Sequence, residues 1–419
     1  MAVDTPARIV ILGAGPVGIE AGLYARFLGY EVAIYEQGEL AEHVRRWGHV
    51  RMFTPVRLLR STLGLAAIQA QEPGYHPPDE EALLSGHEWL DSYLRPLSQT
   101  DLLSDAIHTH TQVVAVSRFE LLKGEWPRGE DRRDLPFRIL LRDSEGREWD
   151  DSADAVIDAT GVFGTPNWLG QGGAPAIGET FARPHIEYGI PDVLGAQHEE
   201  YAGRRVLLVG SPPAVAFTLL GLVELARRAP GTHVTWVTRS PAEEGLPAPI
   251  PAALGDPFAE RARLIDAANT CAASPPPVLA YWPGTQVESL VPPEGGNPWK
   301  VVLRGGHAGA FEFDRVIANV GYRPQSDLFS ELQIEQCCYC GRPGRHRQGH
   351  APEAAATPDE GPRSLLQAEP DFYILGAKSF GRRPDFLFHL GLRQVRDLFT
   401  ILGDREGLDL YESAKSLLR

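Results

Sequence analysis

RIVILGAGPVG, residues 8–18, is the stretch that decides the fold of this chain. Its apolar first half predicts a strand that is buried on both faces. Gly13, Gly15 and Gly18 follow as a G-x-G-x-x-G pattern, and the next segment has helical spacing. A second apolar run, EVAIYE, ends on Glu36, eighteen residues after Gly18. Strand, glycines, helix, strand and acid in this order predict a dinucleotide-binding βαβ unit.

Each residue of this turn has a physical reason. Gly13 makes the tight turn, and Gly18 lets the helix and the strand pack closely. Gly15 lets a pyrophosphate approach the backbone N–H groups where the helix begins, at Pro16. Glu36 would accept hydrogen bonds from a ribose. The pattern does not say which dinucleotide binds.

Three later segments carry a resemblance to a known superfamily. They read VIDATG at residues 156–161, VIANVGYRP at residues 316–324 and FYILGA at residues 372–377. In this order they resemble flavoproteins with two dinucleotide-binding domains. That superfamily includes flavin-containing monooxygenases, N-hydroxylating monooxygenases and pyridine-nucleotide-disulfide reductases. The resemblance implies that the first site binds FAD.

The resemblance also implies an α/β fold with two Rossmann-like dinucleotide-binding domains. The FAD-binding domain is expected to be discontinuous, with a first part over residues 1–165 and a second part over residues 316–419. The NAD(P)H-binding domain is expected at residues 200–315. A β-rich insert, predicted from the alternating residues 107–116 and their neighbour 137–142, belongs to the first part.

Further FAD contacts follow from the resemblance alone. It puts a basic and aromatic pair near the adenine end or the flavin ring, a backbone group of the insert near the adenine, and two small-residue turns against the cofactor. The residues that match these positions are Arg45, Trp47, Val113, Thr160, Gly161, Gly376 and Ala377. The alternative for Arg45 and Trp47 is a solvated loop, because charge clusters commonly face water.

A second βαβ unit follows a Gly- and Pro-rich stretch, residues 164–195, that we expect to cross between the domains. Its predicted elements are a strand at residues 204–210, a helix at residues 215–227 and a strand at residues 233–238. In the superfamily the ligand of this unit is NAD(P)H.

The second turn departs from the pattern. It reads GSPPAV from Gly210, so Ser211 follows the first glycine and Pro212 takes the place of the second. Proline has no N–H and adds a ring where a pyrophosphate would come closest. Arg239 and Ser240 follow the next strand, where NADPH-dependent members place an arginine for the 2′-phosphate. We therefore predict NADPH binding with altered geometry.

The motif CCYC, residues 337–340, offers two chemical interpretations. Cys337 and Cys340 form a C-x-x-C pair that is typical of a redox dithiol. With His346 and His350 the pair also has the donor types of a zinc site, although only five residues separate the two pairs. The third interpretation is that neither applies, because cysteine is most often a small hydrophobic residue.

The chain after residue 372 bears on the reaction. The resemblance implies that an apolar helix, residues 386–402, directs its N-terminus at the flavin's pyrimidine edge. Disulfide reductases usually have Gly-Asp in the preceding strand, whereas here Gly376 is followed by Ala377 and Lys378. This departure favours the monooxygenases. Lys378 and His389 are candidates to face the isoalloxazine, and the alternative for His389 is a core position.

Composition sets outer bounds on function. The chain has 419 residues, enough for two cores, and a net charge of −15, which argues against a nucleic-acid partner. We expect no membrane span, and residues 1–7 do not resemble a signal peptide. Four cysteines in so long a chain do not make a disulfide framework, which favours the cytoplasm. A small molecule is the expected partner, and a homodimer is left open.

These observations lead to four competing functions. The first is an FAD- and NADPH-dependent monooxygenase, in which a C4a-peroxyflavin oxygenates a small organic substrate. The second is a flavin oxidase or dehydrogenase that takes hydride from its own substrate, consistent with Pro212. The third is a disulfide-type reductase that uses Cys337 and Cys340. A flavin-binding protein without turnover is ranked last. The sequence does not name the substrate.

Overall fold

The computed structural model describes residues 7–126, 130–241, 248–251, 257–343 and 361–418. The chain forms two compact units. Unit 1 comprises Met1–Gly48, Thr54–Thr165 and Arg323–Arg419, and is therefore discontinuous. Unit 2 comprises His49–Phe53 and Pro166–Tyr322.

Unit 1 is built on a parallel sheet of five strands. In spatial order these are β15 (Phe372–Ile374), β7 (Ala155–Asp158), β1 (Arg8–Leu12), β2 (Glu31–Tyr35) and β3 (Ile107–His108). The carboxyl ends of β1 and β7 lie side by side, so the two turns that follow them meet at one edge of the sheet. Ligands of open α/β sheets bind at this edge.

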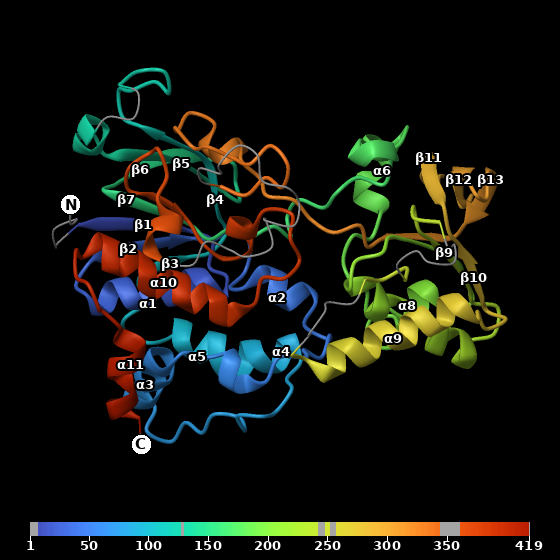
Figure 1. Cartoon of the computed structure of the whole chain (residues 1–419), viewed down its shortest axis with the longest axis horizontal. Coiled ribbons are helices and arrows are strands. Elements are labelled where there is room, and N and C mark those ends of the chain that lie inside the picture. Colours follow the sequence, from blue (N-terminus) through green and yellow to red (C-terminus); the bar gives the residue numbers. More distant parts are fainter. Residues whose placement is uncertain (1–6, 127–129, 242–247, 252–256, 344–360, 419) are drawn as a thin grey trace. The chain divides into compact units, whose positions relative to one another are not determined.

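The two faces of this sheet carry different layers (Figure 1). Helices α1 (Pro16–Phe27) and α10 (Phe388–Leu402) pack against each other on one face. The other face carries the antiparallel strands β4 (Thr111–Arg118), β5 (Phe137–Asp143) and β6 (Glu148–Ala153). Side chains of both sheets form a shared core, which includes Val10, Leu12, Val116, Phe137, Ile139, Leu141, Val156 and Phe372.

A layer of short helices completes unit 1. Apolar residues at helical spacing between residues 80 and 97 predict one helix. The helix begins only at Gly86 and runs as α4 (Gly86–Trp89), a π-helical turn η2 (Leu90–Leu94) and α5 (Arg95–Ser98). The reason for this start is a capping box, in which Ser85 and Glu88 each bond the backbone N–H of the other.

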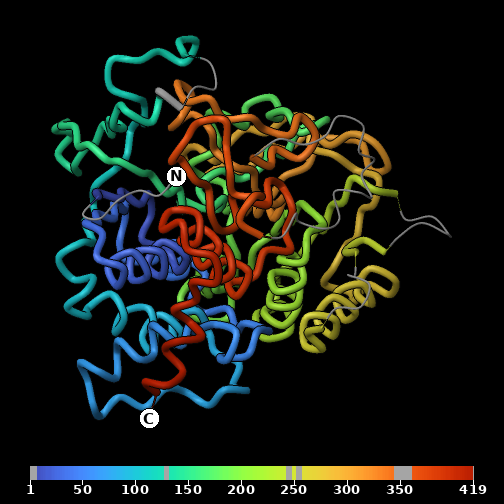
Figure 2. Tube along the Cα trace, turned by 60° about the vertical axis from the view of Figure 1, so that its left-hand side comes forward, coloured from blue at the N-terminus to red at the C-terminus, as the bar shows by residue number. Residues whose placement is uncertain are grey.

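The last helix, α11 (Leu410–Ala414), lies beside α3 (Thr62–Gln71), so the C-terminal segment returns to residues far earlier in the chain. Figure 2 shows this red segment next to the blue trace. Stacked rings of Tyr24 and Phe399 hold α1 and α10 together at a centroid distance of 4.9 Å.

Unit 2 has a parallel sheet of four strands. In spatial order these are β10 (Leu279–Trp282), β9 (His233–Val237), β8 (Arg205–Val209) and β14 (Arg315–Ala318). Its two long helices are α8 (Ala214–Arg228) and α9 (Ala259–Ala273), which pack against each other. The order strand, helix, strand of the predicted second βαβ unit is confirmed.

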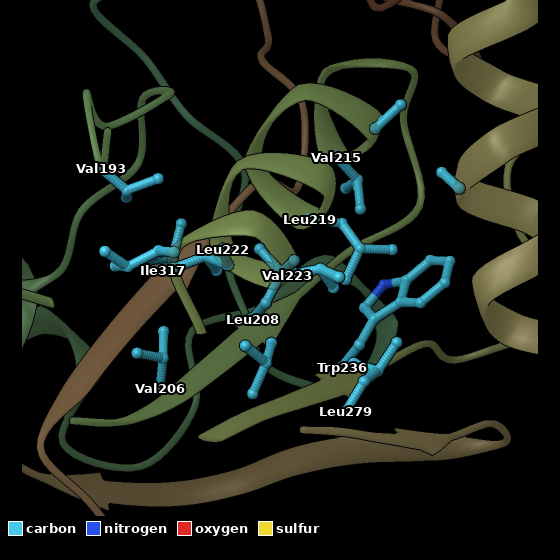
Figure 3. Close-up of a cluster of buried hydrophobic side chains, with 14 of the residues drawn as sticks. Val193, Val206, Leu208, Val215, Leu219, Leu222, Val223, Trp236, Leu279 and Ile317 are labelled. Carbon is cyan, nitrogen blue, oxygen red and sulfur yellow. The ribbon is translucent and has the colours of Figure 1, made fainter. Parts of the chain in front are cut away.

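Side chains alternate between the faces of this sheet, as the period of two in a strand requires. Val206 and Leu208 point to the layer of α8, where they meet Leu219 and Leu222 beside Trp236 (Figure 3). On the other face Leu207, Val209 and Val316 join a core with the antiparallel strands β11 (Thr285–Val291), β12 (Trp299–Gly305) and β13 (Gly309–Phe313). Both units therefore place a parallel sheet between helices and a three-stranded antiparallel sheet.

Two expectations about connections need correction. Residues 107–116 do not form one strand, because His110 has φ +55° and separates β3 from β4. Residues 166–195 are not a bare crossing but part of unit 2. Their anchor is the buried carboxylate of Glu179, which accepts hydrogen bonds from the backbone N–H groups of Leu169 and Ala176 and from the hydroxyl of Tyr188.

Among the described helices, none has the length and apolar character needed to cross a bilayer.

Candidate functional site

The first turn of unit 1 requires glycine at two positions for packing. Gly13 has φ +95°, and a Cβ there would lie 3.0 Å from the carbonyl oxygen of Ala159. A Cβ on Gly18 would lie 2.0 Å from the carbonyl oxygen of Gly13. No side chain fits at 2.0 Å, and at Gly13 the tight contact adds to a positive φ that residues with a side chain rarely adopt. The contact between α1, β1 and the turn after β7 therefore requires glycine at both positions.

Gly15 differs from both. A Cβ on Gly15 would meet no atom within 4 Å, so this face of the turn is open. Gly15 is the N-cap of α1, Pro16 follows it, and no side chain caps the helix. Uncapped N–H groups at a helix N-terminus attract anions. Of the three fingerprint glycines, Gly15 is the one whose missing side chain leaves room for a ligand.

Glu36 lies directly behind this turn. Its two carboxylate oxygens accept hydrogen bonds from the backbone N–H groups of Ala14 and Gly38, each at 3.0 Å. Burial raises the pKa of Glu36, and these N–H groups act against the rise. Each oxygen keeps a further lone pair, which is what acceptance from a ribose hydroxyl needs.

A small cavity of about 50 Å³ opens over the turn. Gly13, Gly15, Pro16, Glu36, Ala159 and Thr160 line it together with a set that the sequence did not single out: Ala41, Glu42, His43 and Val44. The new members belong to the short helix α2 (Glu42–Arg46) and its N-cap. The backbone N–H of Ala41 donates to the carbonyl of Ala14, which brings α2 to the turn. No sequence motif marks such a contact.

The turn after β7 is organised by a buried ion pair. The N–H and the hydroxyl of Thr160 both donate to Oδ1 of Asp158, at 3.0 and 2.7 Å. Oδ2 of Asp158 pairs with Nζ of Lys378 at 2.5 Å, and Lys378 also lies 3.1 Å from the hydroxyl of Thr160. Lys378 is 1% exposed and Asp158 is fully buried. Gly161 then follows with φ +68° and open space at its Cβ position.

Asp158 was missed by the sequence reasoning, although an acid at the end of an apolar strand is itself a signal. The sequence singled out Lys378 as a residue that faces a flavin. In the structure the amine of Lys378 instead contacts Asp158 and Thr160, beneath the VIDATG turn.

The segment after β15 approaches the same place. Gly376 has φ +73°, and its Cβ would lie 3.5 Å from a methyl group of Val17 on α1. Its N–H donates to Oε1 of Gln394 at 2.8 Å, which ties η9 (Gly376–Phe380) to α10. Ala377, the next residue of η9, lies between Gly376 and the paired Lys378. The fingerprint turn, η9 and α10 therefore converge.

His389 is the second residue of α10. Its Nδ1 is buried, and it has no hydrogen-bond partner within the described part of the chain. Burial and the nearby charge of Arg393 lower the pKa of His389 below its ordinary value. The imidazole is therefore neutral at pH 7, with one ring nitrogen free to bond a ligand.

The remaining residues expected at FAD lie in different surroundings. Arg45 is exposed. The ring of Trp47 packs on Gly86, and its buried Nε1 has no hydrogen-bond partner in the described residues. The side chain of Val113 belongs to the core between the sheets, at a β-bulge of β4. The backbone just before it is tied to Glu36, whose carbonyl accepts from the N–H of Thr111.

The second turn, which follows β8 in unit 2, resembles the fingerprint turn of unit 1 only in part. Gly210 has φ +131°, and its Cβ would lie 1.8 Å from the carbonyl oxygen of Asn319. Pro212 and Pro213 have no N–H to offer. In the first turn of α8, the N–H groups of Val215 and Ala216 donate to the carbonyls of these two prolines at 2.9 and 3.1 Å. Two of the donors that a glycine-rich turn would offer to a pyrophosphate are thus absent, and two more are used inside the turn.

Arg239 and Ser240 follow β9 and are both exposed. Within the ranges that the structure describes, Arg239 forms no ion pair. Ser211 is half-buried beside Gly210. The predicted 2′-phosphate arginine is therefore accessible, whereas the predicted phosphate cradle is altered.

A larger cavity, of about 500 Å³, lies beside α10 and η9 in unit 1. Its lining is rich in arginine and amide groups and includes Arg342, Ser379, Arg393, Gln394 and Arg396. Gln394 links this cavity to the Gly376 backbone. A volume of several hundred Å³ is ordinary for a small-molecule site.

Cys337 and Cys340 lie in one tight turn of unit 1, whereas His346 and His350 lie outside the described residues. The described portion holds no group of three or more histidine, cysteine or acidic side chains placed to bind a metal ion. The four-residue zinc interpretation is one of the alternatives left open by the sequence, and it stays untested.

Comparison with known proteins identifies the fold. No family model and no curated protein matches the sequence. Among solved structures, bacillithiol disulfide reductase from Bacillus cereus matches with a TM-score of 0.64 and 16% identity, over 96% of this chain and 99% of that chain. The FAD-bound cadaverine monooxygenase of desferrioxamine biosynthesis from Erwinia amylovora matches with a TM-score of 0.62 and 15% identity, over 96% of both chains. The chain has the fold of the two-dinucleotide-binding-domain flavoproteins.

A third structure of this flavoprotein fold carries both cofactors. Ornithine N-hydroxylase from Kutzneria, with reduced FAD, NADP⁺ and L-ornithine, matches with a TM-score of 0.59 and 14% identity, over 96% of this chain and 100% of that chain. The expected fold is confirmed by these matches. They include both monooxygenases and disulfide reductases, so the fold does not separate the two reactions.

The residues of unit 1 fit the dinucleotide that this flavoprotein fold implies. Gly15 offers an open face at an uncapped helix N-terminus. Gly161 offers a second open face on the neighbouring turn. Trp47 and His389 contribute buried ring nitrogens that have no hydrogen-bond partner among the described residues. Buried polar groups of a folded protein are normally satisfied, so these atoms are consistent with a bound polar molecule.

Proposed function

We propose that this protein is an FAD-dependent oxidoreductase whose first turn holds the pyrophosphate of FAD. The observation that carries the proposal is the contrast between Gly15, which is open, and Gly13 and Gly18, which are closed by backbone contacts. Two glycines serve packing, and the third serves a ligand. A glycine-rich turn without a ligand has no need of the third.

Within this class we propose an NADPH-dependent monooxygenase that acts on a small organic substrate. Disulfide reductases of this superfamily place their dithiol near one of the two fingerprints. This chain has no cysteine before Cys271, so neither fingerprint has a dithiol beside it. It also has Ala377, rather than an aspartate, directly after Gly376. Both features favour a reaction in which the protein supplies no thiol.

When bound, FAD accepts hydride from the reductant and carries out the oxygen chemistry. The residues of this chain bind it and shape its surroundings. The uncapped N-terminus of α1 attracts the pyrophosphate, and Glu36 accepts from the ribose. The N-terminus of α10, which has no side-chain cap, favours negative charge nearby. Neutral His389 offers a hydrogen bond without adding charge.

The reductant would bind unit 2 through its 2′-phosphate more than through its pyrophosphate. Arg239 is exposed after β9 and suits a forked contact to a phosphate. The second turn contributes fewer N–H donors than the first, because of Pro212 and Pro213. We expect a clear preference for NADPH over NADH and modest affinity for both.

The same two prolines favour one alternative, an oxidase or dehydrogenase that takes hydride from its own substrate. In that case unit 2 keeps the fold of a nucleotide-binding domain without the binding. The alternative predicts that neither NADPH nor NADH reduces the flavin at a useful rate. It also predicts peroxide release, or reduction of another electron acceptor, when the organic substrate alone is present.

Anaerobic mixing of the FAD-loaded protein with NADPH separates these proposals. Loss of the visible flavin absorbance supports the NADPH-dependent enzyme, and no loss with NADPH or NADH removes it. On admission of oxygen, a substrate pool should then yield a product one oxygen atom heavier by mass spectrometry. Arg239→Gln should weaken NADPH but not NADH. Arg228→Gln, which alters an exposed arginine paired with Glu224 on α8, is the matched control.

A further inference from the structure

Cys337 and Cys340 are held in a closed turn. The N–H of Cys337 donates to the carbonyl of Arg342, and the N–H of Gly341 donates to the carbonyl of Cys337, both at 2.8 Å. Gly341 has φ +70°, a left-handed conformation that lets the chain reverse. A bridge between Gln336 and Pro343 closes the base of the turn. The two thiols of this turn lie close enough for a hydrogen bond between their side chains.

The turn gives the two thiols unequal surroundings. Burial opposes ionisation of Cys337. However, the N–H groups of Cys340 and Tyr339, the thiol of Cys340 and the charge of Arg342 together lower the pKa of Cys337 below its ordinary value. Burial raises the pKa of Cys340, and the neighbouring Cys337 adds to this rise. Cys337 is therefore the more acidic thiol of the pair, and Cys340 is the one that holds its proton more tightly.

The turn is also fixed to the segment that follows β15. The N–H of Arg382 donates to the carbonyl of Cys340 at 2.9 Å. A Cβ on Gly381 would lie 2.4 Å from the same carbonyl oxygen, so the two backbones are in close contact. Gly381 directly follows η9, which carries Gly376 and Lys378. A conformational change in the turn of Cys337 and Cys340 would therefore displace the backbone where η9 ends.

We propose that Cys337 and Cys340 form a peroxide-sensitive dithiol, in which Cys337 is the attacking sulfur and Cys340 is the resolving sulfur. The two thiols are already in contact, both are partly exposed, and no disulfide joins them in the structure. The site lies apart from either fingerprint in sequence. It does not depend on the reaction proposed above.

The reaction balances with one hydroperoxide per pair. The Cys337 thiolate attacks one oxygen of hydrogen peroxide, the O–O bond breaks, and hydroxide leaves and is protonated to water. Cys337 is thereby oxidised to a sulfenic acid, and the peroxide is reduced. The Cys340 sulfur then loses its proton and attacks the Cys337 sulfur, so that an S–S bond forms and the S–O bond breaks to release the second water. A thiol reductant reverses the change.

The exposed neighbour, Cys338, provides a matched control. It lies in the same turn, and its thiol is accessible. Oxidation of the full-length, FAD-loaded protein with limiting hydrogen peroxide should remove two hydrogen atoms by intact mass. Peptide mapping should place the link between Cys337 and Cys340, and dithiothreitol should restore both thiols. Cys338→Ser should behave as the parent protein.

Two variants separate the roles of the two thiols. In Cys340→Ser, Cys337 should accumulate as a sulfenic acid that dimedone traps, which is a gain that a misfolded turn would not give. In Cys337→Ser, peroxide should leave Cys340 reduced. Iodoacetamide at mildly acidic pH should label Cys337 about tenfold faster than Cys338, because the thiolate is the reactive form.

Several results would overturn the proposal. One is a bond between Cys337 and Cys338, or direct oxidation of Cys337 to a sulfinic acid while Cys340 is present. Another is equal labelling of Cys337 and Cys338. A third is one zinc ion per purified chain that is released only when the thiols are modified and that protects them from peroxide, which would make the pair metal ligands instead.

Discussion

The two turns that follow β1 and β8 start in the same way and end differently. Gly13 approaches the chain after β7, and Gly210 approaches the chain after β14, each with positive φ and no room for a Cβ. After that first glycine the turns diverge. The first has an open glycine, Gly15, and a free helix N-terminus. The second has Pro212 and Pro213, and the N–H groups of Val215 and Ala216 bond back to them.

This difference separates two requirements that a sequence motif combines. The first glycine serves the packing of strand, turn and neighbouring strand, and a βαβ unit needs it whether or not a ligand binds. The middle glycine serves the ligand, because its Cβ position faces open space. A chain can therefore keep the fold of a dinucleotide-binding unit and still change its phosphate site.

The neighbouring turns show a similar contrast. Under the turn after β7, Asp158 pairs with Lys378 in full burial. At the end of β14, Asn319 instead accepts a hydrogen bond from Thr218 and donates one to the carbonyl of Gly189. A buried ion pair holds the turn after β7, whereas neutral hydrogen bonds hold the turn after β14. The loss of one partner should therefore cost far more stability in the turn after β7.

The largest expected effect is therefore from Lys378→Met. It leaves Asp158 buried and unpaired, and should lower the free energy of unfolding by about 3–5 kcal/mol. Urea unfolding of the flavin-free protein measures this loss. The matched change in unit 2, Thr218→Val, should cost only about 1 kcal/mol.

The double variant Lys378→Met with Asp158→Leu tests whether charge is the cause. It should regain most of the loss, because no charge is left buried. If Lys378→Met alone is as stable as the parent protein, the contrast between the two turns is wrong.

The next largest effect distinguishes the glycines of the first turn. Gly18→Ala should destabilise the flavin-free protein by about 3 kcal/mol, because its Cβ meets backbone that is unable to move aside. Gly15→Ala should leave that stability within about 0.5 kcal/mol. It should nevertheless reduce FAD affinity at least about tenfold, since the added methyl occupies the approach of the pyrophosphate. Thermal unfolding without FAD and titration with FAD measure the two effects. Equal losses of stability in the two variants would remove the division of roles.

Helix α1 buries an acid, Glu20, two residues after Gly18. The equivalent position of α8, two residues after Val215, holds Phe217. Burial raises the pKa of Glu20 to about 7, against hydrogen bonds from Tyr93, Ser61 and Tyr411. The folded state therefore holds a proton that the unfolded state releases near the ordinary value of 4.5. This contribution to stability is complete below that value and is lost as pH rises to about 7.

Glu20→Gln removes the titration. Between about pH 5 and pH 8, ionisation of Glu20 should lower the free energy of unfolding of the parent protein by about 2–3 kcal/mol. The variant should lack this part of the pH dependence. Denaturant unfolding at a series of pH values provides the measurement. Parallel pH profiles for the two proteins would contradict the assignment.

The smallest expected effect is the repair of the second turn. Pro212→Gly restores an N–H and removes a ring, and should tighten NADPH binding about tenfold, or by about 1.4 kcal/mol. Pro212→Ala restores the N–H alone and should recover less. Fluorescence titration with NADPH compares the variants with the parent protein. Unchanged affinity in both would mean that the prolines do not limit the site.

Much of this architecture follows from the sequence. The fingerprint at residues 8–18 and the VIDATG segment predict the fold, because each strand is an unbroken apolar run and each turn is marked by glycine. Local patterns do not report distant partners. Asp158 and Lys378 are 220 positions apart, and only the parallel pairing of β15 with β7 brings them together.

The candidate site is less predictable for the same reason. Gly13, Gly15 and Gly18 follow one pattern in the sequence, yet only the structure separates the open position from the closed ones. Helix α2 reaches the cavity through the left-handed residue Ala41, which no motif marks. In the second turn the sequence predicts the loss of the Pro212 donor. The hydrogen bonds from Val215 and Ala216 back to the prolines are seen only in the structure.

The central claim is that the first turn holds a flavin dinucleotide and that the second does not hold one. Titration of the purified, flavin-free protein with FAD tests it most directly, with binding followed by isothermal calorimetry and by the visible spectrum. We predict one FAD per chain and a yellow protein, with FAD affinity reduced at least about tenfold in Gly15→Ala and unchanged in Pro212→Gly. A protein that stays colourless, or that binds FAD equally well after Gly15→Ala, would contradict the account.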